Sequence, residues 1–183
     1  MSLKLTSKDV VLWNALISGY TKCGDVEKVI CCIEKMQQEG VSPDTITLVC
    51  SLKSYSSLVF IEKMHAEIIK KGFDKDLFIG STLVDTYAQI GLLEVARQVF
   101  DNLPVKDVIL WTALITGHAE HEHGEEALNL MKEMQTHNIS PNTFVLVSGL
   151  KVCGDARDIN QGSVIHSDIV KKGLQNETFI ANT

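Results

Sequence analysis

The sequence is organised around Asp9-Val10-Val11-Leu12-Trp13-Asn14-Ala15-Leu16-Ile17, which returns 98 residues later as Asp107-Val108-Ile109-Leu110-Trp111-Thr112-Ala113-Leu114-Ile115. The two copies keep this register without a gap as far as Lys53 and Lys151. A second pairing, of Ile69-Lys70-Lys71-Gly72 with Val170-Lys171-Lys172-Gly173, has an offset of 101, so the first copy is three residues shorter between Lys53 and Met64. Self-similarity over such a length predicts a repeat protein.

Composition is that of an ordinary globular protein, with 183 residues, 45% hydrophobic and 22% charged. The net charge of −6 argues against a protein that holds nucleic acid mainly by neutralising phosphates. No apolar run approaches the ~20 residues of a spanning helix, and the N-terminus lacks the apolar core of a signal peptide, so a soluble chain without a membrane partner is expected. Five cysteines without a C-x-x-C pair favour a reducing compartment over a disulfide or zinc framework.

Apolar residues recur with the period of an α-helix, first over residues 10–22 and again after the Gly24-Asp25 turn. Such a unit is a helical hairpin, and it needs its neighbours to bury both apolar stripes, so an all-α solenoid of antiparallel helix pairs is expected. Trp13 and Trp111 lie on the stripes and should be core residues. The two stripes of the first unit are Trp13, Leu16, Ile17 and Tyr20, then Val29, Ile30, Ile33 and Met36.

Three motifs carry a family resemblance: Val-Val-Leu-Trp-Asn-Ala-Leu-Ile-Ser-Gly-Tyr from Val10, His-Ala-Glu-Ile-Ile-Lys-Lys-Gly-Phe from His65, and Ala-Arg-Gln-Val-Phe-Asp-Asn-Leu-Pro from Ala96. The chain resembles the pentatricopeptide repeat family, in its plant subclass that cycles through P, L and S repeats. The resemblance implies a right-handed superhelical solenoid. A single domain over 10–183 would comprise repeats 10–44 (P), 45–76 (L), 77–107 (S), 108–142 (P), 143–177 (L) and 178–183, the start of an S repeat.

The resemblance implies binding of single-stranded RNA, one base per repeat, with the first repeat toward the RNA 5′ end. The fifth and last residues of each P or S repeat would read the base, which gives the pairs Asn14 with Asp44, Ser81 with Asp107, and Thr112 with Asn142, plus Asn182 alone. The L repeats place Val49 with Asp76 and Val147 with Glu177, and no base is assigned to them. The second residue of each repeat would pack against the base: Val11, Ile46, Phe78, Ile109, Phe144 and Phe179.

Side-chain chemistry supports these roles independently. Val11 and Asn14 are three residues apart and share a helix face, so one can stack while the other bonds a base edge. An Asn amide offers the donor and acceptor that uracil requires, the carboxylate of Asp107 suits the two donors of guanine, and Asn142 suits adenine. The expected target is 5′-UNGANY-3′. The first-helix stretches carry only three lysines against seven carboxylates, so stacking rather than charge should supply the affinity.

Other classes of function fit the sequence less well. A protein-binding scaffold of the tetratricopeptide type is the main alternative, although its 34-residue period fits units of 31 to 35 residues poorly. His118-Ala119-Glu120 has the H-x-E form of a zinc deaminase, but the P-C-x-x-C that must accompany it is missing. His118, His121 and His123 span a helix end and a turn without fixed geometry. Neither an enzyme, a cofactor nor a metal site is therefore expected.

The resemblance also suggests a cellular setting. Proteins of this type mostly specify cytidines for C-to-U RNA editing in mitochondria or chloroplasts, through C-terminal extensions that this chain lacks. Editing accessory proteins would then be partners of the L repeats. Without polar capping repeats, the apolar surface beside Thr178-Phe179-Ile180 favours self-association, and the chain looks like a piece of a longer array.

Overall fold

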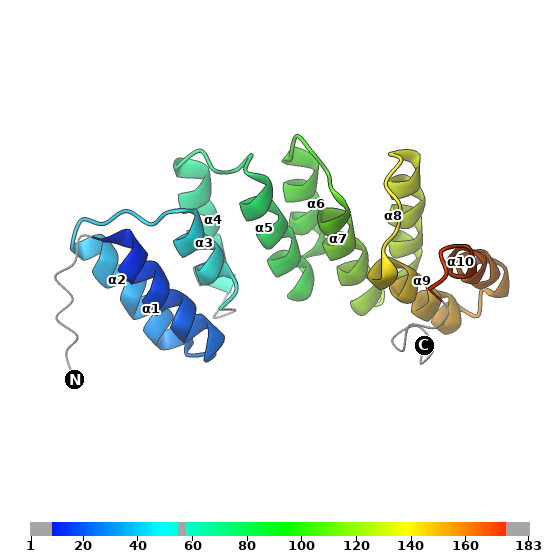
Figure 1. Ribbon diagram of the computed structural model, residues 1–183, viewed down its shortest axis with the longest axis horizontal. Helices are drawn as coiled ribbons and strands as arrows, with labels where there is room; N and C mark the ends of the chain where they lie inside the picture. The colour runs from blue at the N-terminus through cyan, green and yellow to red at the C-terminus, as the bar shows by residue number, and fades with distance from the viewer. Residues whose placement is uncertain (1–8, 55–57, 175–183) are drawn as a thin grey trace. The chain divides into compact units, whose positions relative to one another are not determined.

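The computed structural model describes residues 9–54 and 58–174, and within them it contains ten α-helices and no strand. The all-α fold expected from the repeats is therefore confirmed. The helices are α1 (Val10–Lys22), α2 (Val26–Gln38), α3 (Thr45–Leu52), α4 (Leu58–Lys70), α5 (Leu77–Gln89), α6 (Leu93–Asn102), α7 (Val108–Glu120), α8 (Gly124–Thr136), α9 (Thr143–Ala156) and α10 (Ile159–Lys171) (Figure 1).

Helix boundaries follow from capping residues in the sequence. The side chain of Asp25 accepts a hydrogen bond from the Lys28 amide at the start of α2, which satisfies one of the free N–H groups of the first turn. The same helix ends before Gly40, whose φ of +76° lies in the left-handed region that glycine tolerates. There the Val41 amide bonds back to the Met36 carbonyl at 2.9 Å. The turn then leads into α3.

The chain forms two compact units, residues 1–86 and 87–183. In the first, α1 packs against α2 and α3, and α3 packs against α4 (Figure 1). Trp13 is only 2% exposed, as its place on the apolar stripe predicts. The largest fully buried side chains of the first unit are Ile17, Met36, Leu48, Leu52, Ile61, Met64, Ile68, Ile79 and Leu83.

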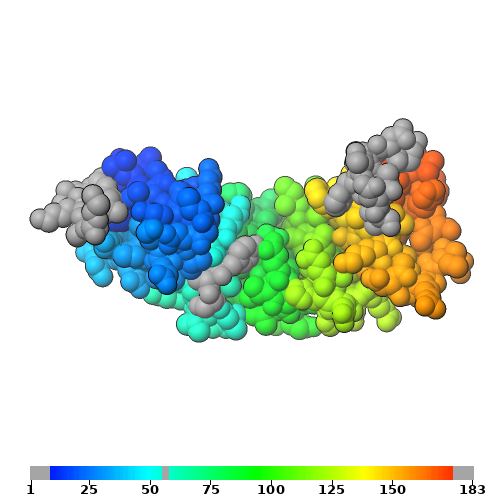
Figure 2. Space-filling model, turned by 90° about the horizontal axis from the view of Figure 1, so that it is seen from below, coloured from blue at the N-terminus to red at the C-terminus, as the bar shows by residue number. Residues whose placement is uncertain are grey.

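In the second unit, α7 packs against α6, α8 and α9, and α9 packs against α8 and α10. The α7–α9 contact is the counterpart of α1–α3, as the duplication predicts. Trp111 is fully buried and meets the Phe100 ring edge-to-face, with centroids 4.6 Å apart. Side chains fill the space between neighbouring helices of each unit (Figure 2).

The second repeat, which is shorter in sequence, also has a shorter first helix. Helix α3 has 8 residues, whereas its counterpart α9 has 14 and continues to Ala156. The C-cap of α9, Arg157, has a left-handed φ of 54°. Helix α3 is thus six residues shorter than α9, although the sequence lacks only three, and the two helices begin at equivalent residues, Thr45 and Thr143.

The last residues of α5, which belong to the second unit, approach α7 closely. A Cβ atom added at Gly117 would lie 2.5 Å from the Ala88 Cβ and 3.2 Å from its Cα. At Gly19, the counterpart of Gly117 in α1, an added Cβ meets nothing within 4 Å. Glycine is therefore required by packing in α7 and not in α1.

None of the helices in the part of the chain that the structure describes is long and apolar enough to cross a membrane.

Candidate functional site

The first predicted reading pair comes together at the junction of α1 and α3. The Asn14 side chain lies on α1 and Asp44 is the N-cap residue of α3. The Asn14 Nδ2 atom donates to both carboxylate oxygens of Asp44, at 3.0 Å and 2.9 Å. Residues 30 positions apart therefore form one polar group, because the first helices of successive repeats pack side by side.

Thr47, which the sequence analysis did not single out, completes this group. Its Oγ1 atom lies 2.5 Å from the Asn14 Oδ1 and 2.9 Å from the Asp44 Oδ1. Thr47 is fully buried, and Asn14 is only 6% exposed. Asn14 thus departs from the open position expected of it: its amide is recessed between α1 and α3, where Thr47 and Asp44 bond it. It remains off the apolar stripe of Trp13 and Ile17.

The charge state of Asp44 fixes the orientation of the Asn14 amide. Partial burial raises the pKa of Asp44, but hydrogen bonds from the Thr47 backbone and from the Asn14 and Thr47 side chains outweigh it, so the pKa lies below its usual value. The carboxylate is ionised at neutral pH and can only accept hydrogen bonds. The Asn14 Nδ2 must therefore face Asp44, and its Oδ1 must face Thr47.

The predicted pair of the fourth repeat, Thr112 with Asn142, comes together at the junction of α7 and α9. The Asn142 Nδ2 donates to the Thr112 Oγ1 at 2.9 Å, while its Oδ1 accepts from the Val145 amide at 3.0 Å. The Thr112 hydroxyl donates its own proton to the Val108 carbonyl at 2.6 Å. The amide orientation is again fixed, and one N–H of Asn142 stays available for a ligand.

The two members of the predicted pair of the third repeat, Ser81 and Asp107, lie in different units. The Ser81 hydroxyl donates to the Leu77 carbonyl at 2.6 Å. Asp107 caps α7 by accepting from the Leu110 amide at 2.9 Å. Three predicted residues, Glu177, Phe179 and Asn182, lie outside the described residues, as does the apolar segment beside Thr178.

The L repeats offer a different fifth residue. Val49 is 4% exposed and apolar, so it presents no hydrogen-bonding group to a ligand. Val147 in α9 is half-buried. Asp76 accepts from the Ile79 amide at 2.9 Å at the start of α5. The L repeats thus share the acidic residue at the repeat end without a polar partner at the fifth position.

Large apolar side chains stand exposed at the second position of each described repeat. Their exposed fractions lie between 54% and 66%, so these side chains are open to solvent and could contact a ligand. The residues are Val11, Ile46, Phe78, Ile109 and Phe144. Each is one helical turn before the fifth residue of its own repeat.

Sequence reasoning missed a second role of the predicted base-reading residues, which is to cap helices. Asp44, Asp107 and Asn142 are the N-caps of α3, α7 and α9. The signal was present, because Asp or Asn just before an apolar-periodic run is the usual start of a helix. Asp44 and Thr47 also form a capping box, whose Asp-x-x-Thr spacing is visible in the sequence.

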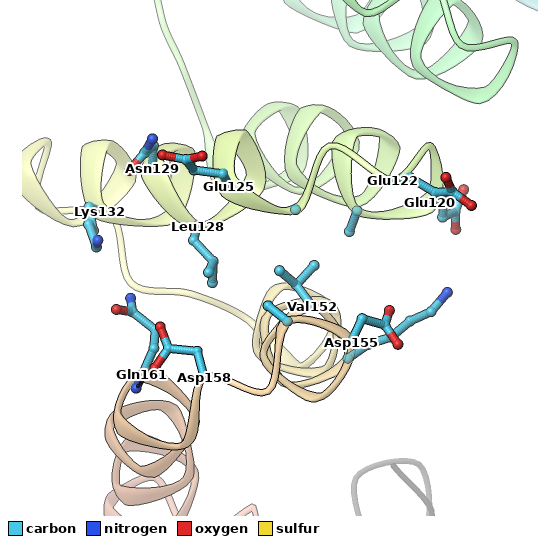
Figure 3. A pocket seen from close by; sticks show the side chains of 14 residues that line it. Glu120, Glu122, Glu125, Leu128, Asn129, Lys132, Val152, Asp155, Asp158 and Gln161 are labelled. Carbon is cyan, nitrogen blue, oxygen red and sulfur yellow. Dashed lines mark hydrogen bonds between the residues drawn. The ribbon is translucent and has the colours of Figure 1, made fainter.

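A cavity of about 920 Å³ lies in the second unit, and neither Thr112 nor Asn142 lines it (Figure 3). Leu128 and Val152 line it between acidic side chains, with only Lys132 and Lys151 opposing them. An excess of carboxylates disfavours anionic ligands such as RNA phosphates. The acidic residues are Glu120, Glu122, Glu125, Asp155 and Asp158.

The three histidines near the end of α7 make separate contacts. The rings of His118 and His123 meet edge-to-face with centroids 5.9 Å apart, and the His121 Nε2 lies 3.2 Å from the Gln89 carbonyl oxygen. Burial, followed by the charge of His123, lowers the pKa of His118. No group of three metal-ligating side chains occurs within residues 9–54 and 58–174.

Repeated helix pairs with polar side chains joined between successive first helices define a helical-repeat protein of the solenoid class. A model of the PPR repeat family matches residues 8–57 and 106–155, the two copies of the 98-residue duplication. The chain belongs to the pentatricopeptide repeat family.

Related proteins agree with this assignment. A pentatricopeptide repeat-containing protein of Arabidopsis thaliana is 33% identical over 178 residues, or 96% of this chain and 24% of the relative. A second, chloroplastic one is 30% identical over 98% of this chain and 23% of its own length. The chain therefore spans about a quarter of the relatives it matches.

Solved structures share the fold. The maize pentatricopeptide repeat protein PPR10 superimposes with a TM-score of 0.69 at 21% identity, over 96% of this chain and 26% of PPR10. PPR10 in complex with an 18-nucleotide psaJ RNA element superimposes with a TM-score of 0.76 at 18% identity, over 92% and 26%. The solenoid fold is thereby confirmed.

Proposed function

We propose that this chain binds single-stranded RNA, reads one base per repeat, and is the specificity-determining part of a longer protein. The observation that carries the proposal is the recurrence of a hydrogen-bonded polar pair, Asn14 with Asp44 and Thr112 with Asn142, at positions 98 residues apart. Exposed apolar side chains stand one turn before each pair. Stacking beside a hydrogen-bonding edge is how proteins read unpaired bases.

At the first site, Asn14 reads uracil. Both Asp44 oxygens lie toward the same N–H of the Asn14 amide. The two N–H bonds of an amide diverge too widely for each of them to reach a different oxygen of one carboxylate. The other N–H and a lone pair of Oδ1 are left for the base. Uracil complements them with a carbonyl oxygen and its N3–H.

At the fourth site, Thr112 and Asn142 read adenine. The free N–H of Asn142 donates to adenine N1, and the Asn142 Oδ1 accepts from the exocyclic amine. The third site pairs the small Ser81 with the acceptor-only Asp107 and reads guanine. The full target is 5′-UNGANY-3′, with the last base assigned to Asn182.

The repeats fit the plant subclass of P, L and S units, whose members act in organellar RNA editing or processing. One Arabidopsis relative is chloroplastic and another, 32% identical over 90% of this chain, is mitochondrial. These relatives support a location in a chloroplast or mitochondrion. The apolar, buried Val49 offers no base preference to its L repeat, and editing accessory proteins are the further partners proposed for the L repeats.

The test is Asn142→Asp, which replaces the free donor by an acceptor. We expect the preference at the fourth base to move from adenine to guanine by about 1–3 kcal/mol. Helix α9 should be unaffected, because Asp caps a helix as well as Asn does. The measurement is a titration of both proteins with RNAs that differ only at this base.

Asn129→Asp is the matched control, since it makes the same substitution at an exposed position of α8. It should leave the base preference unchanged. Equal adenine-to-guanine affinity ratios in wild type and Asn142→Asp would contradict the code and favour a protein-binding scaffold.

A further inference from the structure

We infer that Thr47 is a third specificity-determining residue at the first base site: its hydroxyl positions the Asn14 amide so that the site distinguishes uracil from cytosine. The inference rests on the proposed function. Thr47 lies on the following repeat, and it acts through Asn14 rather than by touching the base.

The geometry directs the hydrogen bond of the Thr47 hydroxyl toward the Asn14 Oδ1. Its Oγ1 accepts from the Asp44 amide at 3.2 Å, so the hydroxyl is oriented by the cap of α3. It has one proton to donate, and the Asn14 Oδ1, at 2.5 Å, is closer than the Asp44 Oδ1, at 2.9 Å. Because Thr47 is fully buried, bulk water does not compete for this bond.

The orientation of the Asn14 amide matters because uracil and cytosine have opposite patterns of hydrogen-bond donors and acceptors on the edge that it contacts. Uracil presents a donor at N3 and an acceptor at position 4, whereas cytosine presents an acceptor at N3 and a donor at position 4. An amide can match either edge, but a half-turn about its final bond exchanges Oδ1 and Nδ2 and so exchanges the preference. A fixed amide therefore selects one base.

Two groups hold the amide in place from its two ends. Ionised Asp44 attracts Nδ2, and Thr47 donates to Oδ1. The duplication supplies an internal comparison, because the counterpart of Thr47, 98 residues later, is the buried Val145. The second copy thus lacks this hydroxyl, and its amide is oriented by the Val145 backbone and by Thr112 instead.

The experiment compares Thr47→Val with wild type in binding two RNAs that differ only in having uracil or cytosine as the first base. Wild type should bind the uracil RNA more tightly. Loss of one hydrogen bond should reduce that ratio by about three- to tenfold. Val145 shows that valine fits the equivalent position, and circular dichroism would verify the helix content.

Two further variants separate positioning from stability. Thr47→Ser keeps the hydroxyl and should keep the wild-type ratio. Thr21→Val removes another threonine hydroxyl from the same α1–α3 junction, where it donates to the Ile17 and Cys50 carbonyls, and it should also leave the ratio unchanged. Thr47→Ala replaces Thr47→Val if the latter does not fold.

The outcomes are distinct. An unchanged ratio in Thr47→Val, or an equal loss of affinity for both RNAs, would overturn the role of Thr47 while leaving the code intact. Wild type without a uracil preference would overturn both at this site, and Asn142→Asp at the fourth base would then show whether the code fails elsewhere.

Discussion

Asp44 has two tasks at the residue scale, since it caps α3 and holds Asn14. Removing it would leave the buried Asn14 amide without its acceptor and the first turn of α3 without its cap. The exposed Asp158 side chain, by comparison, caps α10 by accepting from the Gln161 amide.

We expect Asp44→Ala to lower the free energy of unfolding by about 2–4 kcal/mol, the sum of a lost cap and an unsatisfied buried amide. Asp158→Ala, which removes only a cap, should lower it by about 1 kcal/mol. Urea unfolding of both variants measures the difference. Equal losses would show that the Asn14 contact adds no stability.

The same contact predicts a pH dependence. The pKa of Asp44 is lower in the folded protein than its usual value, so its stabilisation is complete above the unfolded pKa, near ~3.9, and is lost as pH falls through the folded pKa. The stability difference between wild type and Asp44→Ala should therefore be constant near neutral pH and shrink below about pH 4. A difference that grows on acidification would contradict this assignment.

At the element scale, the sequence predicted the helices better than it predicted the contacts between them. Helix α1 ends where its apolar period and the Gly24-Asp25 turn require, because helix boundaries depend on local chemistry. The burial of Asn14 was not predicted, since it depends on Thr47 of the next repeat. The close approach at Gly117 likewise needs the position of Ala88 on another helix.

This contrast between elements can be tested with one substitution made twice. Gly117→Ala should destabilise the protein by about 1–3 kcal/mol, because the added methyl group overlaps Ala88. Gly19→Ala, at the corresponding position of α1, should stabilise it by about 0.5–1 kcal/mol through helix propensity. Thermal unfolding of the two variants distinguishes them, and two changes of the same sign would contradict the packing argument.

At the scale of the whole molecule, charge sets the character of binding. The chain carries a net charge of −6, and the only Lys or Arg residues on the described first helices and their C-caps are Lys22, Lys53, Lys151 and Arg157. Exposed apolar side chains, by contrast, recur in every described repeat. Affinity for RNA should come from stacking and base edges, and non-specific affinity should be low.

The expected consequence is a weak response to salt. With four cationic side chains, the slope of log K against log salt should be no steeper than about −3, at ~0.7 for each phosphate contact on a single strand. Titration of the 5′-UNGANY-3′ RNA over a range of salt concentrations measures it. A much steeper slope would mean that the phosphate backbone, rather than the bases, dominates binding.

The caps at the repeat ends also limit how such a protein can evolve. Asp44, Asp107 and Asn142 each start the next helix with the side chain assigned to the base. Only Asp, Asn, Ser, Thr and, less well, Gly perform that task without destabilising the helix. The need to cap the next helix therefore limits which residue types can be used at this position to change the base specificity. Attempts to reprogram these repeats with Gln, Arg or His at the same position would weaken the scaffold along with the old specificity.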